Sequence, residues 1–322
     1  IVNKYRQLKM KLAVIMDPIE KIIPEKDGTL DLLLAAQDRN YELVYFEQQN
    51  LRIIDGSPLG KGRPLTVKDD IEQWFQFSND NEYCLSDFDV ILMRKDPPFN
   101  LEYIYCTYVL DLAENQGSKV INQPSALRNF NEKVSITLFP SMTPQTLVTS
   151  SVKEIREFLE HHGKIVVKPL DGMGGRSVFV VDSNDLNAQS IFETITNLSS
   201  VTIMAQVYVP EIQEGDKRIH IVYGQHCNTA LARIPSDQDN RGNLVMGAKG
   251  QTQELTSRDK EICEAIGPTL LEHGIYFAGI DVIGDYLTEI NITSPTGMRE
   301  IKRYAGEDVS GFFFNCLESR DQ

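Results

Sequence analysis

Residues 164–181 read KIVVKPLDGMGGRSVFVV. An apolar run ends at Lys168, a turn with three glycines follows, and a second run rich in β-branched and aromatic residues extends to Val181. This pattern predicts two strands joined by a glycine turn. Because glycine lets backbone N–H groups come close to an anion, the turn is suited to cover phosphates. The stretch therefore predicts a lid over a nucleotide, with Lys168 on the strand that enters the turn; an ordinary exposed hairpin stays open as the alternative.

Two common phosphate-binding loops do not match this stretch. A P-loop carries Lys followed by Ser or Thr directly after its glycines, whereas Gly174 and Gly175 are followed by Arg176 and Ser177. A dinucleotide-binding loop continues into a helix, but residues 177–181 favour a strand. A different kind of nucleotide site is therefore expected.

The composition is that of a globular protein with two or three domains. The 322 residues are 41% hydrophobic and 24% charged, and no apolar run reaches the roughly 20 residues that span a bilayer. The net charge of −14 argues against nucleic acid or an anionic membrane as a partner, because both require Lys and Arg to neutralise phosphates. A small anionic ligand in a locally basic pocket is compatible with it. We expect a cytoplasmic protein with reduced thiols, because its five cysteines are odd in number and form no CxxC pair: Cys84, Cys106, Cys227, Cys263 and Cys316.

The first part of the chain alternates predicted strands and helices. Such alternation predicts an open, mostly parallel sheet, in which ligands lie beyond the carboxyl ends of the strands. Polar residues stand at those ends, where ligand binding and simple solvation are both open: Asp17, Arg94, Lys95 and Asp96. The predicted strands are 11–17, 41–46, 89–99 and 119–122, the predicted helices are 30–39 and 102–115, and the stretch between 47 and 88 shows no regular pattern.

From about residue 129 the pattern changes to α+β. We expect an extension at 1–9 without the apolar segment of a secretory signal, an α/β domain at 10–128 and an α+β domain at 129–322. In the last of these, helices are predicted around 131–133, 152–161 and 189–198, and strands at 145–148, 164–168, 177–181 and 201–209.

Residues 279–297, GIDVIGDYLTEINITSPTG, carry the strongest sign of a metal site. The two-residue period of a strand places Glu289 and Asn291 on one face, and a hairpin through Gly284-Asp285 brings Asp281 back beside them. A plain two-residue loop would point Asp281 and Glu289 to opposite faces, so a shared site predicts an odd-numbered loop or a bulge. Carboxylate and amide oxygens suit Mg²⁺ bound together with nucleotide phosphates, whereas the alternative is an exposed polar strand face.

Several cations are spaced through the second half of the chain. Each alone suggests a surface charge, but with the lid and the carboxylates they suggest counter-charges for a triphosphate and a carboxylate substrate: Lys133, Lys168, Arg218, Arg233 and Arg241. The strand at 201–209 ends at Pro210 and is either a core strand or a hinge whose backbone reads an adenine edge. The long polar loop at 234–249 suggests a second lid.

These segments resemble those of the bacterial glutathione synthetases, a family within the ATP-grasp ligases. The resemblance runs through nearly the whole chain from Met10, and its most specific segments are MRKDPPF (93–99) and KPLDGMGG (168–175). It implies an N-terminal open-sheet domain followed by an ATP-grasp domain, made of a lid subdomain (about 129–205) and a C-terminal subdomain (about 206–322). The implied assembly is a homotetramer.

The resemblance also implies an activity. The family joins the cysteinyl carboxylate of γ-glutamylcysteine to glycine, and ATP becomes ADP and phosphate through an acyl-phosphate intermediate. Two alternatives stay open: another ATP-grasp carboxylate–amine ligase with a different acceptor, and a nucleotide-binding regulator without catalysis. No side chain is identified as the base for the glycine amine.

By the same resemblance, each group of site residues has an expected role. Catalytic contacts to the transferred phosphoryl group and the substrates are expected from Arg233, Arg218 and Arg241. The nucleotide is expected to contact Lys133, Lys168, Gly172, Gly174, Gly175, Gln206, Val207, Tyr208, Val209 and, near the ribose, Asp216. Peptide or glycine contacts are expected from Arg94, Ser294, Thr296 and Arg299, and Mg²⁺ ligands are expected to be Asp281, Glu289 and Asn291.

One segment departs from the family pattern. The closing loop reads NLVMGAKG at 243–250, where the family tends to have more glycine and an arginine. Lys249 supplies a positive charge but not the planar fork of an arginine, so the dynamics of the loop or the affinity for glycine are expected to differ.

Overall fold

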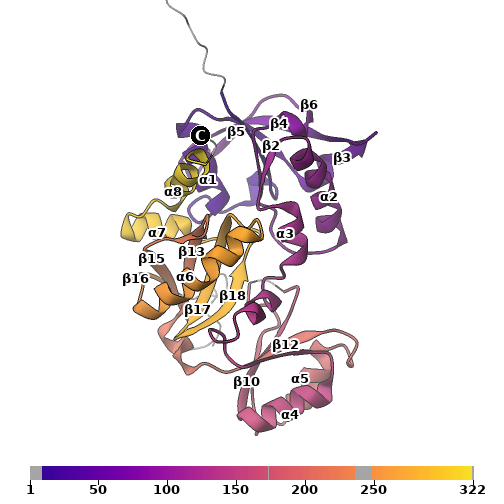
Figure 1. Ribbon diagram of the computed structural model, residues 1–322, viewed down its shortest axis with the longest axis vertical. Helices are drawn as coiled ribbons and strands as arrows, with labels where there is room; N and C mark the ends of the chain where they lie inside the picture. Colours follow the sequence, from indigo (N-terminus) through magenta and orange to yellow (C-terminus); the bar gives the residue numbers. More distant parts are fainter. Residues whose placement is uncertain (1–8, 173, 236–248, 321–322) are drawn as a thin grey trace, which may run out of the picture.

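The computed structural model describes residues 9–172, 174–235 and 249–320. The strands of this part form three sheets, of eight, four and six strands. In Figure 1 the N-terminal sheet lies at the top, the four-stranded sheet at the bottom and the six-stranded sheet between them. No helix in the described ranges is long and apolar enough to cross a membrane.

The N-terminal sheet has a parallel centre, which confirms the prediction of an open, mostly parallel sheet. Strands β2 (Glu42–Phe46), β1 (Lys11–Ile15), β7 (Val90–Met93) and β8 (Lys119–Ile121) are adjacent and parallel in that order. Their apolar residues are buried on both faces, as a parallel sheet covered by helices requires. Strand β2, which follows β1 in the chain, lies on one side of β1, and β7 lies on the other side. The order of the strands therefore changes direction between β1 and β7.

The stretch between 47 and 88 forms antiparallel strands, which the sequence did not predict. They are β3 (Leu51–Ile54), β4 (Ser57–Val67), β5 (Phe75–Phe77) and β6 (Asn81–Cys84), and β4 pairs with β2 and with the other three. Glycines in β4 serve close packing, since an added Cβ would lie 2.9 Å from the Phe46 ring at Gly60 and 2.5 Å from it at Gly62.

Two layers of helices cover this sheet. Alternate residues of β1 point to opposite faces: Leu12 and Val14 belong to the core shared with α1 (Gly28–Asp38) and α8 (Val309–Glu318). Ala13 and Ile15 belong to the core that includes α2 (Leu101–Asn115) and α3 (Pro124–Asn129). The last helix of the chain thus packs on the first sheet.

The four-stranded sheet, here called the lid, is antiparallel in the order β11-β10-β12-β9. Its strands are β9 (Thr146–Thr149), β10 (Lys164–Pro169), β11 (Phe179–Asp182) and β12 (Ile203–Val207), and its helices are α4 (Val152–His162) and α5 (Ala188–Ile195). The pairing of Val167 with Phe179 confirms the predicted strand, turn and strand. Residues 165 and 167 join the core beneath α4 and α5, so residues 166 and 168 face the other way, towards the cavity described below.

The six-stranded sheet has the order β16-β15-β13-β17-β18, with β14 beside β13. Its elements are β13 (Asp216–Val222), β14 (Gln225–His226), β15 (Thr229–Ile234), β16 (Lys249–Glu254), β17 (Phe277–Ile283), β18 (Tyr286–Asn291), α6 (Ser257–Glu272) and α7 (Met298–Ala305).

The helix predicted around Asn131–Lys133 is wrong. These residues form a turn before a 3-10 helix at Val134–Leu138. The side-chain oxygen of Asn131 accepts hydrogen bonds from the backbone N–H groups of Lys133 at 3.0 Å and Val134 at 2.9 Å. Such local bonding by Asn replaces the bonds that a longer helix would need.

Candidate active site

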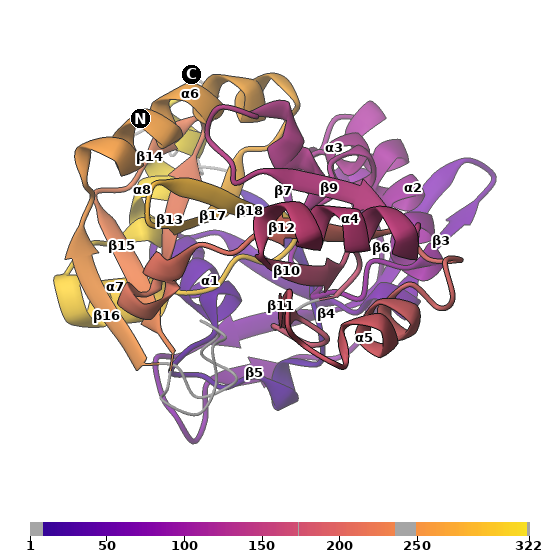
Figure 2. The ribbon, with the colours of Figure 1, turned by 90° about the horizontal axis from the view of Figure 1, so that it is seen from below.

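A cavity of about 390 Å³ lies where the N-terminal sheet, the lid and the six-stranded sheet meet. Figure 2 shows the molecule from the lid end, with the lid strands near β17 and β18. Most of the residues expected at the site line this cavity: Lys133, Lys168, Gly172, Gly174, Gly175, Gln206, Val207, Tyr208, Val209, Asp216, Arg218, Arg233, Asp281, Glu289, Asn291, Ser294 and Thr296.

The hairpin of β17 and β18 brings its polar residues onto one face. Ile283 pairs with Tyr286 across a two-residue loop, yet Asp281 pairs with Glu289 because the register shifts at Thr288. The extra residue is a bulge, as the parity of the hairpin predicted. Gly279 pairs with Asn291 farther along, so Glu289 and Asn291 stand on the face that carries Asp281.

The carboxylate of Asp281 is held by two arginines. Arg218 donates from Nε to Oδ1 at 2.6 Å and from Nη2 to Oδ2 at 3.2 Å, and Arg233 Nη2 lies 2.9 Å from Oδ2. Burial acts to raise the pKa of Asp281, but the charges and hydrogen bonds of the two arginines outweigh it and hold the pKa well below its usual range. Asp281 is therefore a permanent anion in the cavity wall.

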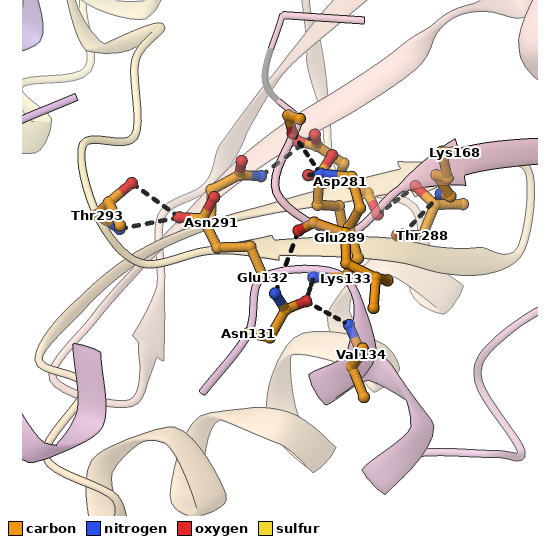
Figure 3. A network of polar contacts seen from close by, with 12 residues as sticks. Asn131, Glu132, Lys133, Val134, Lys168, Asp281, Thr288, Glu289, Asn291 and Thr293 are labelled. Carbon is orange, nitrogen blue, oxygen red and sulfur yellow. Dashed lines mark hydrogen bonds and ion pairs between the residues drawn. The ribbon is translucent and has the colours of Figure 1, made fainter. Parts of the chain in front are cut away.

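The second carboxylate of the hairpin is paired with a lysine. Lys133 Nζ lies 3.0 Å from Glu289 Oε1 and donates to the carbonyl of Gly172 in the glycine turn at 2.6 Å (Figure 3). Burial acts to lower the pKa of Lys133, but the charge of Glu289 raises it overall. This lysine thus connects the glycine turn to the carboxylate hairpin.

Lys168 enters the cavity from β10. Its Nζ lies 3.4 Å from the carbonyl of Thr288, and burial lowers its pKa although the charge of Glu289 opposes the shift. A partly buried ammonium group in this position gains from an anionic ligand, which restores the interactions lost on leaving water.

The residue types of the hairpin fit a hard divalent cation. Asp281, Glu289 and Asn291 offer oxygen atoms from one face of the sheet, and Asn291 Nδ2 donates to Gly279 O at 3.1 Å and to Asp281 Oδ2 at 3.3 Å. Within residues 9–172, 174–235 and 249–320, no three His, Cys, Asp or Glu side chains are grouped to hold a metal. A cation here would therefore need further oxygens, such as those of phosphates.

Buried charges hold the segment 292–297 against the cavity. A Glu132 carboxylate oxygen accepts from Ile292 N at 2.8 Å, Thr293 N at 3.0 Å and Thr293 Oγ1 at 2.9 Å. Arg94 Nη2 donates to Pro295 O at 2.9 Å, and Arg218 Nη1 donates to Thr296 O at 3.3 Å.

Residues 206–209 and Asp216 also line the cavity, and Asp216 shares Arg233 with Asp281. The backbone N–H groups of Val207 and Tyr208 bond to the carbonyls of Gln145 and Lys164, and Lys164 Nζ lies 4.1 Å from the centre of the Tyr208 ring. Burial raises the pKa of Asp216 to about 7, although Arg233 opposes the shift.

Two of the expected site residues are not brought into this cavity, and a third is not among the described residues. Arg94 lies behind it, because its side chain is buried between Thr29 Oγ1, at 3.1 Å, and Pro295 O. Arg299 lines a second cavity and bonds to Asp69. Arg241 lies outside the described residues, as does most of the predicted closing loop (236–248).

The sequence did not single out Glu132, although it stands beside Lys133. Its bonds cross about 160 positions of the chain, and residue periodicity carries no signal at that separation. Asp96, which lines the cavity, was noted at a strand end without an assigned role.

Family models match both parts of the chain. Residues 10–128 match the prokaryotic glutathione synthetase N-terminal domain, and residues 132–306 match the prokaryotic glutathione synthetase ATP-grasp domain. Among solved structures, a D-cycloserine synthetase, DcsG, shares the fold with a TM-score of 0.70 at 14% identity, over 97% of this chain and all of that one. D-alanyl-alanine synthetase A from Vibrio cholerae has a TM-score of 0.58 at 13% identity, covering 97% and 98% of the two chains.

Relatives with higher identity span nearly the full length. The glutathione synthetase of Shewanella oneidensis is 47% identical over 311 residues, which are 97% of this chain and 99% of the relative. That of Pseudomonas syringae pv. tomato is 47% identical over 315 residues, covering 98% and 99% of the two chains. The chain therefore has the ATP-grasp fold and belongs to the prokaryotic glutathione synthetase family.

Proposed function

We propose that the chain catalyses the ATP- and Mg²⁺-dependent ligation of γ-L-glutamyl-L-cysteine and glycine to glutathione, with release of ADP and phosphate. The observation that carries the proposal is one cavity that joins a glycine turn, two lysines, two arginines and the Asp281–Glu289 hairpin. Membership of the glutathione synthetase family supports the choice of substrates.

The first step transfers the γ-phosphoryl group of ATP to the cysteinyl carboxylate. A carboxylate resists attack by an amine because its leaving group would be oxide, and phosphorylation converts that oxygen into part of a phosphate leaving group. Lys133 and Lys168 are proposed to hold the phosphates of ATP under the glycine turn, and Arg233 to meet the phosphoryl group in transfer.

In the second step the free amine of glycine attacks the carbonyl carbon, and phosphate leaves with the electrons of the C–O bond. The acyl phosphate must be protected from water before this attack. We assign that protection to the glycine turn of the lid and to the closing loop, as lids do in other enzymes with reactive intermediates. The arginines near Asp281 would stabilise the negative charge that develops on the leaving phosphate.

Mg²⁺ would be held by Asp281, Glu289 and Asn291 together with phosphate oxygens, and when bound it would neutralise charge on the phosphates. Residues 206–209 are proposed to border adenine and Asp216 the ribose. Ser294 and Thr296, on the segment that Glu132 and Arg94 hold, are proposed to contact the peptide or glycine. Arg218 and Arg241 complete the proposed catalytic set.

We also propose the organisation and setting of the protein. The proposed division is an N-terminal domain (10–128) and an ATP-grasp domain (129–322), the second made of subdomains at about 129–205 and about 206–322. Strand β12 (Ile203–Val207) of the lid crosses the boundary between these subdomains. The family suggests a cytoplasmic homotetramer. Light scattering that gave the mass of a single 36.4 kDa chain at micromolar concentration would contradict the tetramer.

The decisive experiment is ADP release with ATP and Mg²⁺, measured with γ-glutamylcysteine and glycine together and with each omitted in turn. We expect release that requires both. Tight ATP binding without release from this pair would instead favour a ligase with another acceptor or a regulator without catalysis.

The metal assignment has its own test. The double variant Asp281→Asn/Glu289→Gln is expected to lower turnover by a factor on the order of 100 or more and to weaken Mn²⁺ binding in the presence of ATP, measured by electron paramagnetic resonance. Asp80→Asn, which removes a surface carboxylate paired with Lys61, serves as the matched control. Wild-type turnover by the double variant would remove the assignment.

A further inference from the structure

One carboxylate in the cavity wall has no part in the chemistry proposed above. Asp96 and Pro97 line the cavity just beyond the carboxyl end of β7, next to Ser294 and Pro295 of the segment 292–297. They follow a strand of the N-terminal sheet, whereas Lys168 lies on β10 of the lid and Lys133 donates to Gly172 in the glycine turn. The sheet order changes direction between β1 and β7, and open α/β sheets bind ligands at such points.

Asp96 differs from the other carboxylates of the cavity in its partners. Asp216 and Asp281 pair with arginines, Glu289 pairs with Lys133, and Glu132 accepts backbone N–H groups. Over the described ranges of the chain, Asp96 forms no ion pair within 4 Å.

The neighbouring lysine is engaged elsewhere. Lys95 Nζ lies 2.9 Å from Asp17 Oδ1 and donates to the backbone carbonyl of Asp96 at 2.7 Å. The second Asp17 oxygen accepts from Asp96 N at 3.0 Å. Burial raises the pKa of Asp96, the Ser294 side chain opposes this by hydrogen bonding, and the charge of Asp17 adds to the rise. A half-buried anion in this setting is stabilised by a cationic ligand group.

We propose that Asp96 binds the primary ammonium group of an amino-acid substrate and so is a specificity-determining residue. The inference rests on the proposed function, in which two substrates carry such a group: the γ-glutamyl residue of the peptide and glycine. The lysines and arginines at the phosphate side would repel an ammonium group, which leaves the Asp96 end as the favourable place for it.

The test compares Asp96→Asn with wild type in KM for γ-glutamylcysteine, glycine and ATP. Losing a charge-assisted hydrogen bond is expected to raise the KM of one amino-acid substrate by about tenfold or more, with the KM of ATP within about twofold. Asp80→Asn is the matched control, because it removes a surface carboxylate that pairs with Lys61 and does not line the cavity, and it is expected to change each KM by less than about threefold.

A substrate analogue distinguishes the two sources of the ammonium group. N-glutaryl-cysteine has the structure of γ-glutamylcysteine without the α-amino group. If Asp96 binds the peptide, the KM of wild type should be about tenfold or more higher for the analogue than for γ-glutamylcysteine. Asp96→Asn should have about equal KM values for the two peptides, since removing the carboxylate and removing the α-amino group abolish the same interaction. If Asp96 binds glycine, the variant should raise the KM of glycine, and wild type should accept the analogue.

Other outcomes overturn the inference. These are unchanged KM values in Asp96→Asn with full use of the analogue by wild type, or equal rises in Asp80→Asn, or an equal rise in the KM of ATP. Because the analogue is tested on wild-type protein, a poorly folded variant does not decide the result. Wild type that does not turn over γ-glutamylcysteine and glycine contradicts the proposed function itself, before any variant is compared.

Discussion

The guanidinium group of Arg218 contacts both carboxylate oxygens of Asp281, with Nε at 2.6 Å from Oδ1 and Nη2 at 3.2 Å from Oδ2. The planar fork fixes the orientation of the carboxylate in the wall of the cavity. Arg233 contacts the same carboxylate and also pairs with Asp216, so Asp281 is the one anion that both buried arginines share. Asp281 is therefore both the structural partner of two arginines and a proposed ligand of Mg²⁺.

The first prediction concerns this shared anion. Asp281→Asn leaves Arg218 without a carboxylate partner and Arg233 with Asp216 alone, and we expect the free energy of unfolding to fall by about 3 kcal/mol in urea denaturation. Asp80→Asn removes a surface partner of Lys61 and should leave the unfolding midpoint unchanged. Equal midpoints for the two variants would show that the buried pairs do not stabilise the fold.

The second prediction concerns pH and His220. This side chain is fully buried against Phe277, and burial, helped by the charge of Arg218, lowers its pKa from 6.5 to about 3. Between these values the unfolded chain binds a proton that the folded chain does not, so the stability falls as the pH falls.

For wild type, His220 should account for a loss of about 2 kcal/mol in the free energy of unfolding between pH 7 and pH 5. His220→Phe removes the titrating group and should show a correspondingly smaller loss over the same interval. Urea denaturation of both proteins at the two pH values measures the difference. Parallel pH profiles would exclude His220 as the source.

The third prediction concerns Glu132 as a support for the segment 292–297. Glu132→Ala removes the acceptor of three hydrogen bonds and leaves buried N–H groups of Ile292 and Thr293 unpaired, so we expect a loss of about 2–3 kcal/mol in the free energy of unfolding. Glu132→Gln keeps an oxygen acceptor in place and should recover part of the lost free energy of unfolding. A Gln variant as unstable as the Ala variant would mean that the charge matters more than the bonds.

The fourth prediction concerns Lys168 and the nucleotide. Lys168→Met should weaken ATP binding by about tenfold or more in isothermal titration, because a partly buried ammonium group proposed to contact the phosphates would be lost. Lys153→Met, on the exposed side of α4, changes the same charge without reaching the cavity and should leave the affinity unchanged. Similar losses of ATP affinity in both variants would mean that the overall electrostatic field of the protein, and not direct contact by Lys168, attracts the nucleotide.

Local patterns in the sequence predicted the two hairpins that matter most. The glycine turn between β10 and β11 and the bulge that places Asp281 opposite Glu289 both follow from short-range rules of strand period and loop length. The antiparallel strand β4 was not predicted, because its glycines and prolines read as a loop. Those glycines make room for the Phe46 ring, which lies on a different strand.

Contacts between residues far apart in the chain could not be predicted from the sequence. Arg94 was expected at the substrate, but its bond to Pro295 spans 201 positions and places it behind the cavity wall. Arg299 belongs to the same C-terminal region as Ser294 and Thr296, yet it lines a second cavity. Neither fact can be derived from residue spacing, because each depends on how separate parts of the chain dock.

The packing of α8 on the first sheet has a consequence for synthesis on the ribosome. Arg39, at the end of α1, donates to the side chain of Asn315, which follows it by 276 positions. At elongation rates of about 5–20 residues per second, the apolar residues of β1 and α1 stay uncovered by α8 for on the order of 15–60 s after they are synthesised. The nascent N-terminal sheet would therefore be exposed to chaperones, and to its neighbours on the same message, for almost the entire time that the chain is being made.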